Sequence, residues 1–68
     1  MRVYINGEAR EFSSPLSLAQ LIAELDLPPS RIAVELNRTV VRRNEWGTTD
    51  LRDDDRIEIV HFVGGGRS

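Results

Sequence analysis

The sequence predicts an α+β fold in which a mixed sheet of four or five strands packs against one helix. Segments with alternating polar and apolar residues, typical of strands, lie at both ends and in the middle of the 68-residue chain. A segment near residue 20 instead repeats apolar residues at helical spacing. A chain this short forms one domain with a thin core, because folding at this size buries only about 60% of the surface that the unfolded chain exposes.

The first two strands are predicted to form a hairpin. Polar and apolar residues alternate in Arg2-Val3-Tyr4-Ile5, and extended character resumes in Glu8-Ala9-Arg10-Glu11-Phe12. Asn6-Gly7 lies between them. A type I′ turn needs positive φ at both central residues, and Asn-Gly is the pair that best supplies it.

A helix is predicted from Leu18 to Asp26. Ser17 and Gln20 have the spacing of a capping box, in which each side chain bonds the other residue's main-chain N–H. Pro28-Pro29 ends the helical pattern. One helix face carries four apolar residues: Leu18, Leu21, Ile22 and Leu25.

The remaining elements complete a recognisable order. The pattern predicts, in turn, a half-buried strand around Ile32–Leu36, a turn at Asn37–Thr39, a short edge strand at Val40-Val41, one helical turn within Arg42–Gly47, a solvated turn at Asp50–Asp55 and a strand at Arg56–Val63. A hairpin, a crossover helix and two or three further strands make a β-grasp, or ubiquitin-like, arrangement. Residues 1–63 are therefore expected to form the domain, and residues 64–68 a flexible glycine-rich tail.

The last strand divides its side chains between two faces. Ile57, Ile59 and His61 point one way together with Val63, whereas Val60 and Phe62 point the other way. With only one helix, the second face is open to water, and an exposed apolar patch there would mark a partner site. The alternative is that a loop or Trp46 covers Val60 and Phe62.

Composition excludes several classes of protein. The chain has no cysteine and therefore no thiol of its own, and its formal charge of −2 argues against binding nucleic acid, whose binding proteins carry a basic face. No apolar run approaches the roughly 20 residues that span a bilayer, and no signal-peptide core follows the first residues. We expect a cytoplasmic protein that binds neither nucleic acid nor membrane.

No enzyme or metal site is predicted. His61 is the single histidine and has no nucleophile near it in sequence, so a structural role is the better interpretation. The aspartates of the 50–55 segment lack the spacing of a calcium loop. Arg38, Arg42 and Arg43 are expected to be solvated, and Trp46 to close the thin core.

The three glycines Gly64-Gly65-Gly66 carry the distinctive chemistry. They extend at most about 10 Å, and without Cβ atoms they fit a narrow channel in another protein. A terminal carboxylate there becomes an acyl donor once a partner activates it with ATP. The alternative is a plain tail of a β-grasp interaction module.

The whole chain resembles the ThiS family of sulfur carrier proteins. The resemblance is strongest in Val3–Gly7, Ile32–Asn37, Val40–Trp46 and Asp55–Gly66, and the ending Phe-Val-Gly-Gly-Gly is its most specific part. It implies a protein cosubstrate and not an enzyme, monomeric when free, with no bound cofactor.

The resemblance also implies partners and site residues. An E1-like adenylyltransferase of the ThiF type would use ATP and magnesium to adenylate Gly66, a persulfide would convert it to a thiocarboxylate, and thiazole synthase of the ThiG type would take the sulfur. Gly64 and Gly65 complete the tail, and Val60, Phe62 and Val63 lie where such carriers dock.

One departure from the family pattern is the dipeptide Arg67-Ser68, which follows the glycines. An internal glycine has no free carboxylate, so a peptidase must remove the dipeptide unless it is foreign to the natural chain. A carrier for molybdopterin or cysteine synthesis would use the same chemistry and remains an alternative.

Overall fold

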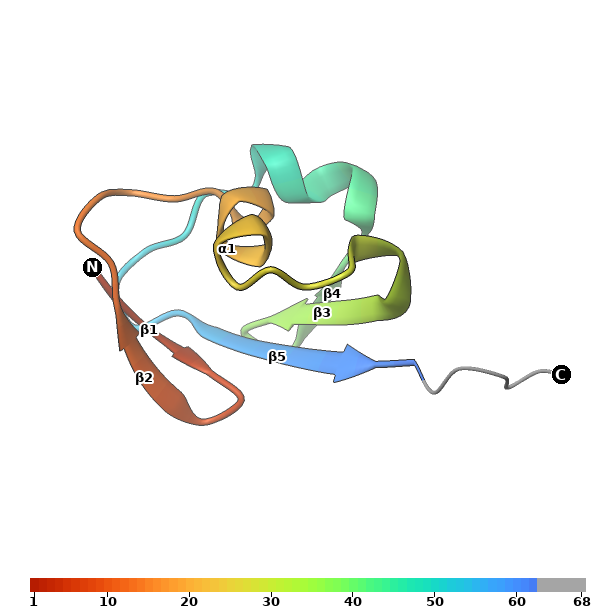
Figure 1. The fold of residues 1–68 in the computed structure, drawn as a ribbon. Coiled ribbons are helices and arrows are strands. Elements are labelled where there is room, and N and C mark those ends of the chain that lie inside the picture. Colours follow the sequence, from red (N-terminus) through yellow and green to blue (C-terminus); the bar gives the residue numbers. More distant parts are fainter. Residues whose placement is uncertain (63–68) are drawn as a thin grey trace, which may run out of the picture.

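Strand β5 lies at the centre of the molecule. The computed structural model describes residues 1–62 and contains a five-stranded sheet in the order β2-β1-β5-β3-β4 (Figure 1). The elements are β1 (Arg2–Ile5), β2 (Glu8–Glu11), α1 (Leu18–Glu24), the 3-10 helix η1 (Pro29–Arg31), β3 (Ile32–Leu36), β4 (Thr39–Val41), the 3-10 helix η2 (Arg43–Thr48) and β5 (Arg56–His61). The predicted mixed sheet on one main helix is confirmed, with five strands.

Two tight hairpins form the outer parts of the sheet. Asn6 and Gly7 join β1 to β2 with φ of 50° and 86°, which is the predicted type I′ turn. Asn37 and Arg38 join β3 to β4 with φ of 51° and 72°, so the same turn occurs a second time. The second turn places an arginine in the left-handed region, where glycine is favoured.

Helix α1 begins as the sequence predicts and ends earlier. The Ser17 hydroxyl accepts from the Gln20 N–H at 3.2 Å, and the Gln20 side chain accepts from the Ser17 N–H at 2.8 Å. The prediction that the helix extends to Asp26 is wrong: it ends at Glu24, because Asp26 adopts a φ of 56° that cannot continue a right-handed helix.

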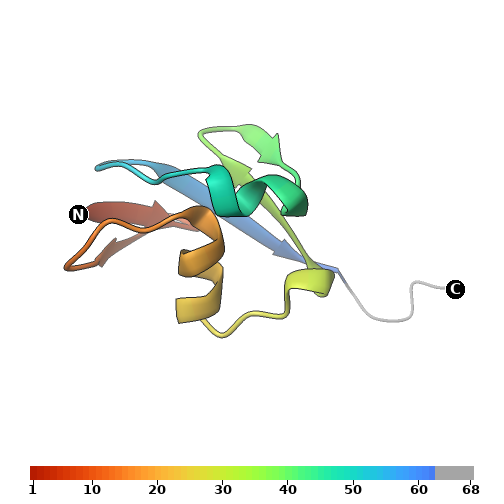
Figure 2. The same cartoon turned by 90° about the horizontal axis from the view of Figure 1, so that it is seen from above.

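The core lies between the sheet and the helices. Figures 1 and 2 show α1 and η2 over the same face of the sheet. Trp46 of η2 is buried, and its indole N–H donates to the Val41 carbonyl at 2.9 Å, which confirms its predicted role of closing the core. The 3-10 helix η2 has six residues, about two turns, where one was predicted. The buried core residues are Val3, Ile5, Leu18, Leu21, Ile22, Ile32, Val34, Trp46, Leu51, Ile57 and Ile59.

Strand β5 joins the two hairpins. It runs parallel to β1, pairing Ile57 with Ile5, and antiparallel to β3, pairing His61 with Ile32. The strand ends at His61, two residues before the predicted Val63. Val63 and the predicted tail of residues 64–68 lie outside the described residues. Within residues 1–62, no helix has the length and apolar character needed to cross a lipid bilayer.

Candidate functional site

The sheet face opposite α1 is open to solvent and carries the predicted apolar patch. Val60 is 59% exposed and Phe62 57% exposed, so neither Trp46 nor a loop covers them. Val40 on β4 is 65% exposed and lies on the same face, since Val40 pairs with Glu35 and Ala33 with Val60. Exposed apolar side chains on one face of a sheet are typical of a surface that meets a partner.

Two carboxylates lie beside this patch. Glu35 on β3 is directly opposite Glu58 on β5, and both are exposed. Like charges in opposite positions of a sheet destabilise it. The face therefore combines apolar side chains with a local negative charge at the middle of β5.

The far end of the same face carries paired charges. The Arg2 guanidinium lies 2.8 Å from the Glu11 carboxylate, and the side-chain hydrogen bond to Glu11 raises the pKa of Arg2. Arg56 lies over the Tyr4 ring at 4.7 Å from its centroid, a cation–π geometry. Each of these charged groups has an attractive partner within the fold, whereas Glu35 and Glu58 carry like charges.

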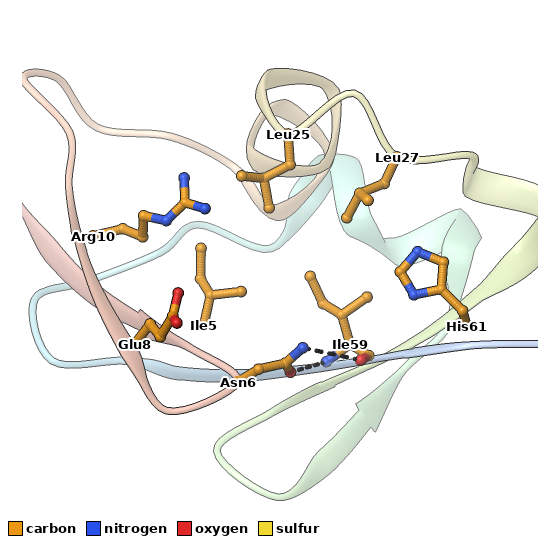
Figure 3. A pocket seen from close by; sticks show the side chains of 8 residues that line it. All are labelled: Ile5, Asn6, Glu8, Arg10, Leu25, Leu27, Ile59 and His61. Atoms are coloured by element: carbon orange, nitrogen blue, oxygen red, sulfur yellow. Dashed lines mark hydrogen bonds between the residues drawn. The ribbon is translucent and has the colours of Figure 1, made fainter.

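A hollow of about 370 Å³ opens on the helix side of the sheet, beside the end of β5. Figure 3 shows Leu25 and Leu27 above it, Ile5 and Ile59 below, Glu8 and Arg10 on one side and His61 on the other. The lining contains no hydroxyl or thiol group, so His61 has no nucleophile to activate there.

Asn6 fixes β5 where the hollow begins. Its side-chain oxygen accepts from the Ile59 N–H at 2.7 Å, and its side-chain nitrogen donates to the Ile59 carbonyl at 3.3 Å (Figure 3). The main-chain N–H of Asn6 also donates to Ile57 at 2.8 Å. The amide of Asn6 thus takes the place of a strand residue beyond the end of β1.

Two aspartates of the 50–55 segment, Asp53 and Asp55, bind main-chain groups. The Asp53 side chain accepts from the Arg2 N–H at 2.8 Å. The Asp55 side chain accepts from the Arg52 N–H at 2.8 Å and from Asn37 at 3.0 Å. Within the described residues, no three acidic or histidine side chains converge as metal ligands would.

The structure brings together part of the predicted site. Val60 and Phe62 share the open face, whereas Val63, Gly64, Gly65 and Gly66 lie outside the described residues. Sequence reasoning did not find Val40, Glu35 or Asn6 as neighbours of this region. The sequence showed that Val40 and Glu35 lie in strands and Asn6 in a turn. Their positions relative to β5 depend on the strand order, which no local sequence pattern encodes.

Comparisons with known proteins agree with this architecture. The family model described as the ThiS family matches residues 3–66. The chain belongs to the ThiS family. This ThiS-family chain is 38% identical to the sulfur carrier protein ThiS of Bacillus subtilis, over 91% of the chain and 96% of the relative. A crystal structure of a thiamine biosynthesis protein, ThiS, from Geobacter metallireducens superposes with a TM-score of 0.85 at 29% identity, covering 97% of this chain and 100% of that one, which confirms the predicted β-grasp fold.

One similar protein is much longer than this ThiS-family chain. The thiazole synthase of Magnetococcus marinus is 40% identical over 98% of the chain, which spans only 21% of that relative's length. A segment similar to this domain therefore occurs within a chain named as a synthase.

Proposed function

We propose that this protein is a sulfur carrier of thiamine biosynthesis that holds sulfur on the carboxyl group of Gly66. The observation that carries the proposal is the family match, which spans nearly the whole chain and stops at Gly66. The lack of cysteine is consistent with it, because the sulfur must then be held at a carboxyl end and not on a thiol. The exposed Val60 and Phe62 give a partner an apolar surface to bind just before the glycines.

The proposed chemistry uses enzymes supplied by partners. An E1-like adenylyltransferase holds ATP and magnesium; the Gly66 carboxylate attacks the α-phosphate, pyrophosphate leaves and an acyl adenylate forms. A persulfide then displaces AMP and forms an acyl disulfide. A thiol attacks that disulfide and releases the thiocarboxylate together with a new disulfide. The carrier itself needs no bound cofactor.

Thiazole synthase is the proposed acceptor of the sulfur. A relative named thiazole synthase contains a segment similar to this chain, and this favours thiamine over molybdopterin or cysteine as the product. We propose that the reactions take place in the cytoplasm and that the free carrier is a monomer. For Gly66 to be charged, Arg67-Ser68 must be absent from the reacting form.

Mass spectrometry tests the proposal. A chain ending at Gly66 is incubated with ATP, magnesium, the cognate adenylyltransferase and a sulfur donor, and its intact mass is recorded. We expect the mass increase of one oxygen replaced by one sulfur. The matched controls are a chain ending at Gly65 and the chain with Arg67-Ser68 in place, and neither should gain sulfur. An unchanged mass of the Gly66 form would contradict the proposal.

A further inference from the structure

The β1 edge of β5 is only partly occupied. The last pair between β1 and β5 joins Ile5 to Ile57, after which the chain turns away at Asn6 and Gly7. The Asn6 amide bonds both the N–H and the carbonyl of Ile59, and so covers one more position of the edge. Beyond Ile59, β5 continues to His61 with no strand on that side in the described part of the chain.

The main chain of His61 faces this open edge. In an antiparallel pair, residues alternate between bonding across the ladder and bonding away from it. Phe62 donates its N–H to the Arg31 carbonyl at 2.8 Å, so Phe62 bonds towards β3. His61, opposite Ile32, therefore points its N–H and carbonyl away from β3. Among residues 1–62, we find no backbone partner for either group.

The hollow lies beside the same edge. Its apolar lining consists of Ile5 and Ile59 below and Leu25 and Leu27 above, and His61 forms part of its wall (Figure 3). A strand added next to His61 would direct alternate side chains towards the helix side of the sheet, where the hollow lies. Free main-chain groups next to an apolar hollow are the features that strand addition uses: the ladder supplies affinity and the hollow supplies specificity.

We propose that thiazole synthase adds an extended strand to the free edge of β5 at His61 and places one apolar side chain in the hollow. The proposal rests on the proposed function. An extended main chain is the group that satisfies an N–H and a carbonyl on one strand edge together. The synthase is the proposed partner because a relative named thiazole synthase includes a segment similar to this chain, and because His61 precedes Gly66, the proposed sulfur carrier, by five residues in the sequence.

Amide hydrogen exchange tests the proposal without any mutation. In the free protein the His61 amide should exchange fast, whereas the Ile59 and Phe62 amides, bonded to Asn6 and Arg31, should be slow. Saturating thiazole synthase should slow exchange at His61 by about tenfold or more, as expected for a newly bonded amide. Unchanged exchange at His61 in the complex overturns the proposal. Protection by the adenylyltransferase but not by the synthase also overturns it.

Two substitutions at one position separate the main-chain bond from the side chain. His61→Ala keeps the N–H and His61→Pro removes it, and proline is tolerated at a strand edge whose N–H faces solvent. We expect His61→Ala to bind the synthase within about threefold of the parent, and His61→Pro to bind about tenfold or more weakly, because a partner carbonyl then stays unbonded. Equal affinity of the two variants overturns the proposal.

The tests distinguish this inference from the proposed function. Protection of the Phe62 amide in His61→Pro verifies that the ladder to β3 is intact; if it is lost, the exchange result on the parent protein decides alone. Sulfur loading of Gly66 and binding of the synthase without protection of His61 would leave the function standing and remove the inference. Failure of the synthase to bind at all would contradict both.

Discussion

Replacing Asn6 by glycine should lower the free energy of unfolding by about 1.5 to 4 kcal/mol. Glycine keeps the left-handed turn, since Asn6 has a φ of 50°, but it removes the bonds of 2.7 and 3.3 Å to Ile59. Each net hydrogen bond contributes about 0.5 to 1.5 kcal/mol, and the added backbone freedom of the unfolded chain costs about 0.5 to 1 kcal/mol more. A typical domain is stable by only about 5 to 15 kcal/mol.

Denaturant unfolding followed by tryptophan fluorescence measures this loss. Trp46 is the single tryptophan and is buried, so its emission reports the global transition. The melting temperature should fall by on the order of 10 °C, given about 4 to 8 °C per kcal/mol for a domain of this size. The Ile59 amide should also lose its protection from exchange.

Asn37→Gly is the matched control. Asn37 occupies the same position of the second turn, with a φ of 51°, but its side chain bonds the Arg56 N–H and the half-buried Asp55 side chain. Both bonds of Asn37 are exposed to water, whereas those of Asn6 are partly buried, so we expect a smaller loss than at Asn6. An Asn6→Gly protein within about 0.5 kcal/mol of the parent, or one more stable than Asn37→Gly, would refute the argument that the Asn6 amide holds β5.

Three further predictions concern the surface. Arg38→Gly should stabilise the protein by about 0.5 to 1 kcal/mol in thermal unfolding. The left-handed conformation costs arginine about 1 to 2 kcal/mol, and the greater freedom of glycine in the unfolded chain cancels part of the gain from relieving it. The control Arg42→Gly, at a φ of −69°, should destabilise the protein, and equal shifts of the two variants would contradict the argument. Glu58→Lys should raise the free energy of unfolding by about 0.2 to 1 kcal/mol, because it replaces repulsion from Glu35 with attraction. The gain should be smaller in high salt, and a gain that does not depend on salt would contradict this electrostatic explanation. Phe62→Asp should weaken partner binding while costing less than about 1 kcal/mol of stability, and a large fall in melting temperature would show that Phe62 packs in the core.

Local rules predicted the elements whose causes are local. The Asn6-Gly7 turn follows from the conformations available to those two residues, and the start of α1 from the reciprocal bonds of Ser17 and Gln20. The end of α1 was harder, because Asp26 enters the left-handed region to direct the chain towards Pro29–Arg31. No glycine in the sequence marks this end of the helix.

The site was predictable in part for a similar reason. Alternation placed Val60 and Phe62 on one face, but whether that face is covered depends on which elements pack where, a property of the whole fold. The opposition of Glu35 and Glu58, and the hollow beside His61, arise from strand order and register. Each joins residues more than 20 positions apart, beyond the range of turn, cap or periodicity rules.

The central position of β5 also sets the order in which the protein can be made. Each outer hairpin is a local structure, but the two meet only through β5, which is the last strand of the described chain. During synthesis, neither hairpin can join the other until the ribosome has released Ile57 and Ile59, both buried. A partner that requires the closed sheet therefore engages only chains whose synthesis has passed β5.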